Sequence, residues 1–530
     1  MKYPLGIQSF DQIINGGYVY VDKTDLVYSL VTEGKIYFLG RPRRFGKSLL
    51  VSTLEHYFLG HKDLFKGLKI DSLEKEWLEY PVFHVDFNGI NFARFGKLEE
   101  MIDFNLTAWE KKYGIVPDKQ LDAGLRFVQV LQKAHERTGR RCVVLVDEYD
   151  KPLLDVLDTG RKVDVDGQEY LLEDWNRDTL RAFYSVFKAA DADLQFVLLT
   201  GVTKFSQVSV FSGFNQPEDI SMSKFYDTLC GITQEELEHY FAEPIAGLAE
   251  EYRCNVEEMK QLLKQRYDGY HFSSRLVDVY NPFSILNVFK SMEMKDYWFS
   301  TGTPTYLLRL LSHSDENLDE LTGKYYGMEE FMDYKATVEK PLPMIYQSGY
   351  LTIKGYELEF GTFLLDFPNN EVKHGFVTLV AANYLKSDRT KMRSWLQELV
   401  VAMRQGDPEA LRKLMTSFLA GIPYTMRRKE DERERERYFH YTFYLIFNMV
   451  SVYTVYTEKE QSEGRVDCIV ETDKYVYVFE FKLDGTAAEA LAQIEEKGYA
   501  RPYEADARKL FRIGAVFSSQ TGTISDWAVE

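Results

Sequence analysis

The chain contains 530 residues, of which 45% are hydrophobic and 15% aromatic, and this composition supplies apolar material for more than one core. The formal net charge of −18 means that the bulk of the surface repels nucleic acid, so any such contact requires a local basic patch. The four cysteines show no metal-ligand spacing, and no segment approaches the ~20 apolar residues of a membrane span. We therefore expect a cytoplasmic protein with reduced thiols and no membrane partner.

The first 230 residues alternate short apolar runs with amphipathic segments. The apolar runs lie at 36–40, 82–87, 142–147 and 195–201. Continuous apolar runs separated by helical segments are typical of a parallel sheet that is covered by helices on both faces. The sequence thus predicts an α/β core over residues 1–230.

The rest of the chain falls into three regions. Residues 231–330 have helical periodicity and predict a helical lid, and residues 331–425 predict a mixed, winged-helix-like connecting region with short strands within 346–360. The run 426–437 is dense in both charge signs and is a candidate boundary, although such a run is more often a solvated helix face. Residues 426–530 predict a compact α/β module.

A candidate phosphate-binding loop, RPRRFGKSL (41–49), lies between an apolar run and a helical segment. In this layout, Gly46 and the backbone around it cradle phosphate oxygens at a helix N-terminus. Lys47 would reach the β- and γ-phosphates, and the hydroxyl of Ser48 would ligate Mg²⁺. The pattern departs from the standard form because Arg41 stands where the first glycine is expected.

A second pattern, CVVLVDE (142–148), has the form of the acidic strand end that a phosphate-binding loop requires. Asp147 would hold Mg²⁺, and Glu148 would activate the attacking water. The alternative is a core strand that merely ends in acidic residues. Because the two patterns occur in the order of a P-loop ATPase, together they predict binding of ATP with Mg²⁺.

Polar residues after the fourth apolar run would face the same ligand crevice. Thr200 or Thr203 would sense the γ-phosphate, and Lys204 would neutralise charge in the transition state, unless this is an ordinary loop. Arg43 and Arg44 lie in the phosphate loop itself. They would contact phosphates or, alternatively, a neighbouring acidic surface.

Several segments in order along the chain resemble one family, the bacterial AAA-like ATPases that carry a C-terminal domain of the PD-(D/E)XK nuclease superfamily. The resemblance implies that the phosphate loop is this family's own variant and that a helical lid follows the ATPase core. The segments that carry it are YVYVDKT (18–24), RPRRFGKSL (41–49), VLVDEYDKP (144–152), TGVTKFSQVSVFSGFN (200–215), YDGYHF (267–272) and VYNPFSIL (279–286).

The C-terminal region contains the residue types of a metal-dependent phosphodiesterase. Asp467 lies in one alternating segment, and Glu480 and Lys482 lie in the next. If residues 472–475 form a four-residue connection, Asp467 lies opposite Glu480, close enough to share one cation. Lys482 would then orient or deprotonate the attacking water. The alternative is an exposed hairpin with ordinary surface charges.

The resemblance extends this site by two residues. Gln493 matches a position in the superfamily's core helix, and it would orient water or substrate. Glu436 matches the first-helix acidic residue that often completes the metal site.

These patterns together favour an ATP-binding and ATP-hydrolysing protein whose nucleotide state controls a Mg²⁺-dependent nuclease. DNA is the expected substrate, and RNA is the alternative. A rival hypothesis is a nucleotide-dependent switch or scaffold whose C-terminal module binds nucleic acid or protein without cleavage. A third is an ATPase-like half that binds ATP without turnover. We find no arginine finger in the sequence, so it does not indicate assembly into a ring.

Overall fold

The computed structural model describes residues 1–204, 217–300, 321–332, 341–384, 389–421, 441–442, 444–446, 448, 454–461 and 464–530. The chain divides into two compact units. The first contains Met1–Glu316 and Leu321–Glu371, and the second contains Asn317–Glu320 and Val372–Glu530. The predicted connecting region, 331–425, is therefore divided between the units at Glu371. In the described part of the chain, no helix is both long and apolar enough to cross a membrane.

A five-stranded parallel sheet forms the centre of the first unit, as the sequence predicts. The strand order is β2–β3–β6–β1–β7. The four predicted strands are present. The side chains of β1, β3 and β6 are largely buried on both faces of the sheet, whereas those of β2 alternate between buried and more exposed positions. The strands are β1 (Ile36–Gly40), β2 (Val82–Asp86), β3 (Cys142–Asp147), β6 (Leu194–Gly201) and β7 (Glu218–Asp219).

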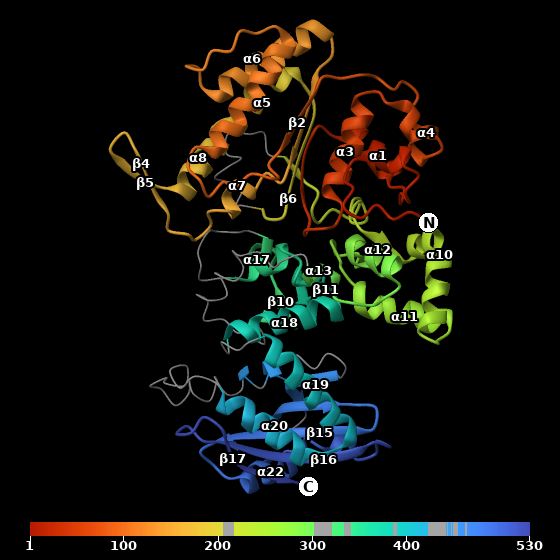
Figure 1. The fold of residues 1–530 in the computed structure, drawn as a ribbon, viewed down its shortest axis with the longest axis vertical. Coiled ribbons are helices and arrows are strands. Elements are labelled where there is room, and N and C mark those ends of the chain that lie inside the picture. The colour runs from red at the N-terminus through yellow and green to blue at the C-terminus, as the bar shows by residue number, and fades with distance from the viewer. Residues whose placement is uncertain are drawn as a thin grey trace. The chain divides into compact units, whose positions relative to one another are not determined.

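Helices cover both faces of this sheet (Figure 1). One group consists of α1 (Phe10–Asn15) and α3 (Lys47–Phe58), and the other of α5 (Lys97–Tyr113), α6 (Ala123–Thr138) and α8 (Leu172–Ala189). Aromatic rings fix both layers. Phe58 of α3 packs on Phe196 of β6 with ring centroids 5.1 Å apart, and Phe127 of α6 stacks on Phe183 of α8 at 5.2 Å.

The predicted lid consists of α10 (Gln234–Glu251), α11 (Val256–Tyr267) and α12 (Pro282–Ser291). Capping boxes at Thr233 and Asn255 begin the first two helices, and their buried apolar faces form one core with α12. The other elements of the first unit before residue 300 are α2 (Thr24–Glu33), η1 (Lys62–Phe65), α4 (Lys69–Leu73), α7 (Lys151–Leu154), β4 (Lys162–Val165), β5 (Gln168–Leu171), η2 (Asp191–Asp193), β8 (Ile232–Thr233), β9 (Val279–Tyr280) and α13 (Tyr297–Ser300).

Residues 321–371 add a small antiparallel sheet in the order β10–β12–β11. The strand prediction for 346–360 was wrong at its start, because Tyr346 and Gln347 end a helix whose first turn contains Pro343. The elements are β10 (Lys324–Tyr326), α16 (Met328–Met332), α17 (Leu342–Gln347), β11 (Thr352–Glu357) and β12 (Thr362–Asp366). Helix α18 (Asn370–Tyr384) begins in the first unit and continues into the second.

The second unit contains a mixed five-stranded sheet in the order β13–β14–β15–β16–β17, in which only β15 and β16 are parallel among the described pairs. Successive side chains of β15 point to opposite faces of the sheet, and both faces are buried along most of the strand. Val476 and Val478 pack in the core with Ile494 of α22, whereas Tyr477, on the opposite face, donates a hydrogen bond to the carbonyl of Met403 in α19. The elements are α19 (Arg389–Gln405), α20 (Pro408–Ala420), β13 (Thr454–Gln461), β14 (Gly464–Glu471), β15 (Tyr475–Leu483), α22 (Ala487–Glu496), η4 (Arg501–Tyr503), β16 (Lys509–Phe517) and β17 (Ile524–Val529).

The buried carboxyl of Asp268, at the end of α11, predicts a pH-dependent stability of the first unit. The side chain is fully buried, and within the described residues neither carboxylate oxygen accepts a hydrogen bond. Burial raises the pKa of Asp268 from 3.8 to about 7. Preferential protonation of Asp268 in the folded state therefore adds to the free energy of unfolding. This contribution is complete below pH 3.8 and is lost as the pH rises through 7, and its upper limit is roughly 4 kcal/mol.

We expect Asp268→Asn to raise the melting temperature of the protein at pH 8 and to have a much smaller effect at pH 5. Thermal unfolding at both pH values measures this difference. The exposed Asp178→Asn in α8 is the matched control and should shift neither value. An equal effect of Asp268→Asn at pH 5 and pH 8 would contradict the prediction.

Candidate nucleotide and metal sites

The loop between β1 and α3 has the backbone of a phosphate-binding loop. Gly46, the residue before α3, has a φ of 95°, which lies in the left-handed region that favours glycine. Lys47 is the first residue of the helix, and its ammonium donates hydrogen bonds to the carbonyls of Arg41 (2.9 Å) and Pro42 (3.2 Å). The side chain of Lys47 thus lies across the loop. The first backbone N–H groups of α3 have no partner within the helix, and they lie at the end of this loop.

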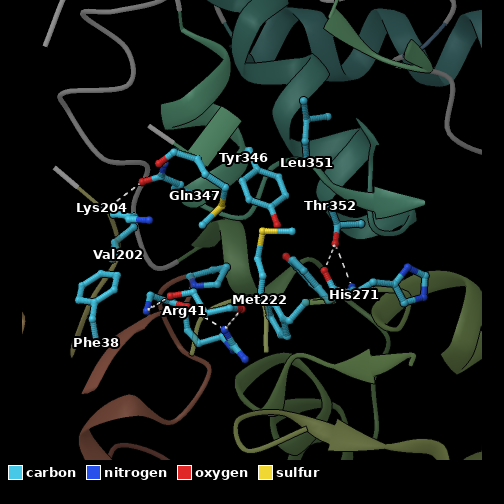
Figure 2. Close-up of a pocket in the computed structure, with 16 residues that line it drawn as sticks. Phe38, Arg41, Val202, Lys204, Met222, His271, Tyr346, Gln347, Leu351 and Thr352 are labelled. Atoms are coloured by element: carbon cyan, nitrogen blue, oxygen red, sulfur yellow. Dashed lines mark hydrogen bonds between the residues drawn. The ribbon is translucent and has the colours of Figure 1, made fainter. Parts of the chain in front are cut away.

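Arg41, which stands where the first glycine of the usual pattern is expected, places its side chain in a separate pocket. Its side chain is buried, and its guanidinium donates to the carbonyls of Ser221 (2.6 Å) and Tyr226 (3.1 Å) and lies 4.1 Å from the ring centroid of Phe272. Figure 2 shows Arg41 in a pocket that it shares with Met222 and His271. Because the side chain enters this separate pocket, it leaves the phosphate side of the loop open.

A cleft of about 660 Å³ lies on the phosphate side of the loop. Its lining includes Arg43, Arg44, Lys47, Ser48 and Glu148, which the sequence predicted as site residues. None of the three cations forms an ion pair with an acidic side chain among the described residues. Cations at a helix N-terminus attract anions, and this set of donors has the chemistry that would fit a polyphosphate.

The acidic end of β3 lies on the same side of the sheet as the phosphate loop, because the strands are parallel. Strand β6 lies between β3 and β1. Asp147 ends β3, and its Oδ1 accepts a hydrogen bond from the hydroxyl of Thr200 at the end of β6 (2.6 Å). Glu148 follows with a φ of 50°, a left-handed conformation that is costly for a residue with a side chain and often marks a functional site. Burial raises the pKa of Glu148, an effect that Lys47 partly offsets.

Lys204 does not line the cleft that contains Lys47, in contrast to its predicted role. Its ammonium pairs with Asp219 of β7 at 2.8 Å, and its backbone N–H donates to the side-chain oxygen of Gln347 at 2.7 Å (Figure 2). Asp219 lies in β7, which pairs with β1, so Lys204 forms its ion pair on the β1 side of β6. Thr200, at the end of β6, is also absent from the lining of this cleft, and its hydroxyl donates a hydrogen bond to the carboxylate of Asp147.

Sequence reasoning missed two parts of the nucleotide cleft. The N-terminal segment 4–8 and the start of α12, with Pro282, Phe283 and Leu286, also line it, and the guanidinium of Arg44 lies 4.8 Å from the ring centroid of Phe283. An apolar recess of about 110 Å³ adjoins the cleft and shares Gly46, Pro282 and Leu286 with it. The available signal was the motif VYNPFSIL, which begins α12.

Other parts of the recess wall come from distant segments of the chain. They include residues 19–21 of the motif YVYVDKT and residues 229–232 at the start of the lid.

The predicted hairpin register in the second unit is confirmed. Cys468 pairs with Phe479, so the same register places Asp467 opposite Glu480. The backbone N–H of Phe481 donates to Oδ2 of Asp467 at 2.8 Å. Lys482, two residues after Glu480, lies on the same face of the strand.

Lys482 contacts two of the other predicted residues directly. Its ammonium donates to Oε1 of Gln493 in α22 (2.5 Å) and lies 3.3 Å from Oε1 of Glu480. Asp467, Glu480, Lys482 and Gln493 therefore form one cluster at this edge of the sheet.

Glu480 has the properties of a cation ligand. The residue is 2% exposed, and its Oε2 is buried without a hydrogen-bond partner among the described residues. Burial and the nearby carboxylate of Asp467 raise the pKa of Glu480 to about 8, whereas Lys482 opposes this effect. A buried carboxylate oxygen that has no donor, beside a second carboxylate, fits a divalent cation such as Mg²⁺. Glu436, the predicted third ligand, lies outside the described residues.

Comparisons with known proteins agree with this geometry. Residues 4–211 match the family described as "Predicted AAA-ATPase", and residues 434–527 match the "PD-(D/E)XK nuclease superfamily". The chain is also similar to a protein of Azotobacter chroococcum mcd 1 described as "Uncharacterized protein in vnfD 5'region". The two are 35% identical over 543 residues, which cover 100% of this chain and 99% of the relative. The resemblance inferred from the motifs is confirmed.

Proposed function

Because the chain belongs to the family of predicted AAA-ATPases that carry a C-terminal domain of the PD-(D/E)XK nuclease superfamily, we propose that it hydrolyses ATP and that its nucleotide state controls cleavage of nucleic acid. DNA is the expected substrate, and RNA is the alternative. The observation that supports the first activity is the cleft with three cations that lack acidic partners in the described chain, next to Glu148. The second is supported by the buried oxygen of Glu480 beside Asp467 and Lys482.

In the proposed ATPase site, the loop backbone and Lys47 bind the β- and γ-phosphates, and Arg43 approaches them from the rim of the cleft. Ser48 and Asp147 would hold Mg²⁺, which when bound neutralises negative charge on the phosphates. Glu148 accepts a proton from the attacking water or orients it, and its strained backbone holds the carboxylate at the cleft.

The recess beside the loop would receive the base of the nucleotide. It is lined mainly by apolar side chains, and it adjoins the phosphate cleft at Gly46, Pro282 and Leu286, which line both. A planar base buries apolar surface there while its phosphates remain at the helix N-terminus. This arrangement accounts for the position of the motif YVYVDKT beside the loop.

Replacing Glu148 with glutamine separates hydrolysis from binding. We expect Glu148→Gln to bind ATP with an affinity close to that of the parent but to release phosphate at least ~100-fold more slowly, because the amide cannot accept the proton of water. Phosphate release and equilibrium binding of a fluorescent ATP analogue measure the two properties. If the parent releases phosphate no faster than Glu148→Gln, the chain binds ATP without turnover.

In the proposed nuclease site, Asp467 and Glu480 would hold Mg²⁺, with Glu436 as the third predicted ligand; when bound, the metal supplies a Lewis acid for the scissile phosphate. Lys482 orients or deprotonates the attacking water and stabilises the negative charge that develops on the phosphate. Gln493 fixes the position of Lys482 through its hydrogen bond to the ammonium.

A chain of contacts supports control of the second unit by the nucleotide. The indole N–H of Trp298 donates to the carbonyl of Arg43 in the phosphate loop at 3.2 Å, and its backbone N–H donates to Glu371 at 2.8 Å. Glu371 also accepts a hydrogen bond from the hydroxyl of Ser284 in α12, which lines the cleft. Since Glu371 lies in the first turn of α18, these hydrogen bonds connect the start of the helix that leads into the second unit with α12 and, through Trp298, with the phosphate loop.

An assay of DNA and RNA cleavage tests the nuclease and its control together. We expect the purified protein to cleave single- or double-stranded nucleic acid with Mg²⁺ or Mn²⁺ but not with a chelator, and ATP should change the rate. Trp298→Phe keeps an aromatic ring, smaller than the indole, and removes the N–H donor, so it should reduce the response to ATP while retaining cleavage. Binding of nucleic acid without cleavage under all these conditions would favour the rival scaffold hypothesis.

A further inference from the structure

One buried carboxylate beside the nucleotide cleft has no part in the proposed chemistry. Asp150 follows Glu148 by two residues and is 1% exposed. Its Oδ2 accepts three hydrogen bonds from the segment after β6: from the backbone N–H of Val202 (2.9 Å), and from the backbone N–H (2.7 Å) and hydroxyl (2.8 Å) of Thr203. A charged acceptor with three donors is a strong link between two chain segments.

Tyr149 forms the second half of this link. Its backbone N–H donates to the carbonyl of Thr200 at 3.0 Å, and its hydroxyl donates to the carbonyl of Thr203 at 2.8 Å. Between these residues, Gly201 is packed so closely that an added Cβ would lie 2.7 Å from the ring of Tyr149 and 2.8 Å from Oδ1 of Asp150. The end of β6 is therefore held at every residue from Thr200 to Thr203.

The residues held in this way include the proposed catalytic ones. The hydroxyl of Thr200 donates to the carboxylate of Asp147. Glu148 lies in the chain between Asp147 and Tyr149, whose backbone N–H is hydrogen-bonded to Thr200. The backbone N–H of Glu148 also contacts Oδ1 of Asp147 at 3.1 Å. The left-handed backbone of Glu148 is thus fixed on both sides, as a strained conformation requires.

We propose that Asp150 is a positioning residue for ATP hydrolysis: its carboxylate fixes the end of β6 against the turn after β3, and thereby holds Thr200 on Asp147 and Glu148 at the cleft. This inference rests on the proposed ATPase activity. Asp150 does not line the cleft, so we expect it to act on the hydrolysis step and to leave nucleotide affinity unchanged.

The test compares turnover with affinity in the full-length protein. Asp150→Asn keeps the size of the side chain, removes its negative charge and replaces one of the two carboxylate oxygens with an NH2 group. We expect kcat for ATP to fall roughly 10- to 100-fold, because small displacements of catalytic groups have effects of this size, while the affinity for a fluorescent ATP analogue stays within about threefold. Asp227→Asn, which alters another buried carboxylate of the first unit, should leave both quantities within about twofold.

The outcomes separate the inference from the proposed function. An unchanged kcat in Asp150→Asn overturns the inference, and a parallel loss of kcat and affinity replaces it with a general structural role. If the parent hydrolyses ATP no faster than Glu148→Gln, the proposed ATPase activity is wrong, and the inference about Asp150, which rests on it, is wrong as well. Should Asp150→Asn fail to fold, Thr203→Val decides: it removes only the hydroxyl donor, and an unchanged kcat would again overturn the inference.

Discussion

Replacing Lys47 with alanine is expected to abolish ATP turnover and to weaken ATP binding at the same time. The ammonium now donates to the carbonyls of Arg41 and Pro42, within the loop that would surround the phosphates. Loss of this cation removes charge stabilisation in both the bound state and the transition state, so we expect turnover to fall at least ~1,000-fold. Phosphate release and binding of a fluorescent ATP analogue measure both effects.

The expected pattern differs from that of Glu148→Gln, which should retain affinity. Lys62→Ala, in the nearby helical turn η1, removes an exposed lysine outside the cleft and serves as the matched control. Lys47→Ala should also remove the effect of ATP on nucleic-acid cleavage while leaving cleavage in the absence of ATP intact. Turnover that survives in Lys47→Ala would contradict the assignment of RPRRFGKS as the phosphate loop.

The strands and the hairpin register were predictable because each depends on local constraints. Buried parallel strands require continuous apolar runs, and four such runs mark β1, β2, β3 and β6. In the second unit, the prediction assumed a four-residue connection at 472–475, and the observed register, which places Asp467 opposite Glu480, agrees with that assumption.

The contacts between distant segments were not predictable. Arg41 turns away from the phosphates, and Lys204 pairs with Asp219, because side-chain direction in a loop depends on what lies beside it. Asp150 bonds to Val202, 52 residues further along the chain, so no local pattern reveals that link. The sequence therefore identified the residue types of both sites, whereas the structure was needed to show which of them converge.

Replacing Lys482 with alanine is expected to abolish nucleic-acid cleavage without loss of metal or substrate binding. The ammonium lies between Glu480 and Gln493, on the same face of β15 as the proposed metal ligand. A cation at this position stabilises charge that develops only in the transition state, so its loss should lower the cleavage rate at least ~100-fold with little change in substrate affinity. Cleavage of labelled DNA and its equilibrium binding in the presence of Ca²⁺ measure the two quantities.

Two comparisons make this result specific. Lys474→Ala removes a lysine from the turn of the same hairpin and should cleave as the parent does, whereas Glu480→Gln should lose metal affinity as well as cleavage. ATP turnover should be unaffected in Lys482→Ala, because none of its contacts involves the phosphate loop. If Lys482→Ala cleaves DNA as fast as the parent, the hairpin is a structural element with surface charges, and the second unit acts by binding alone.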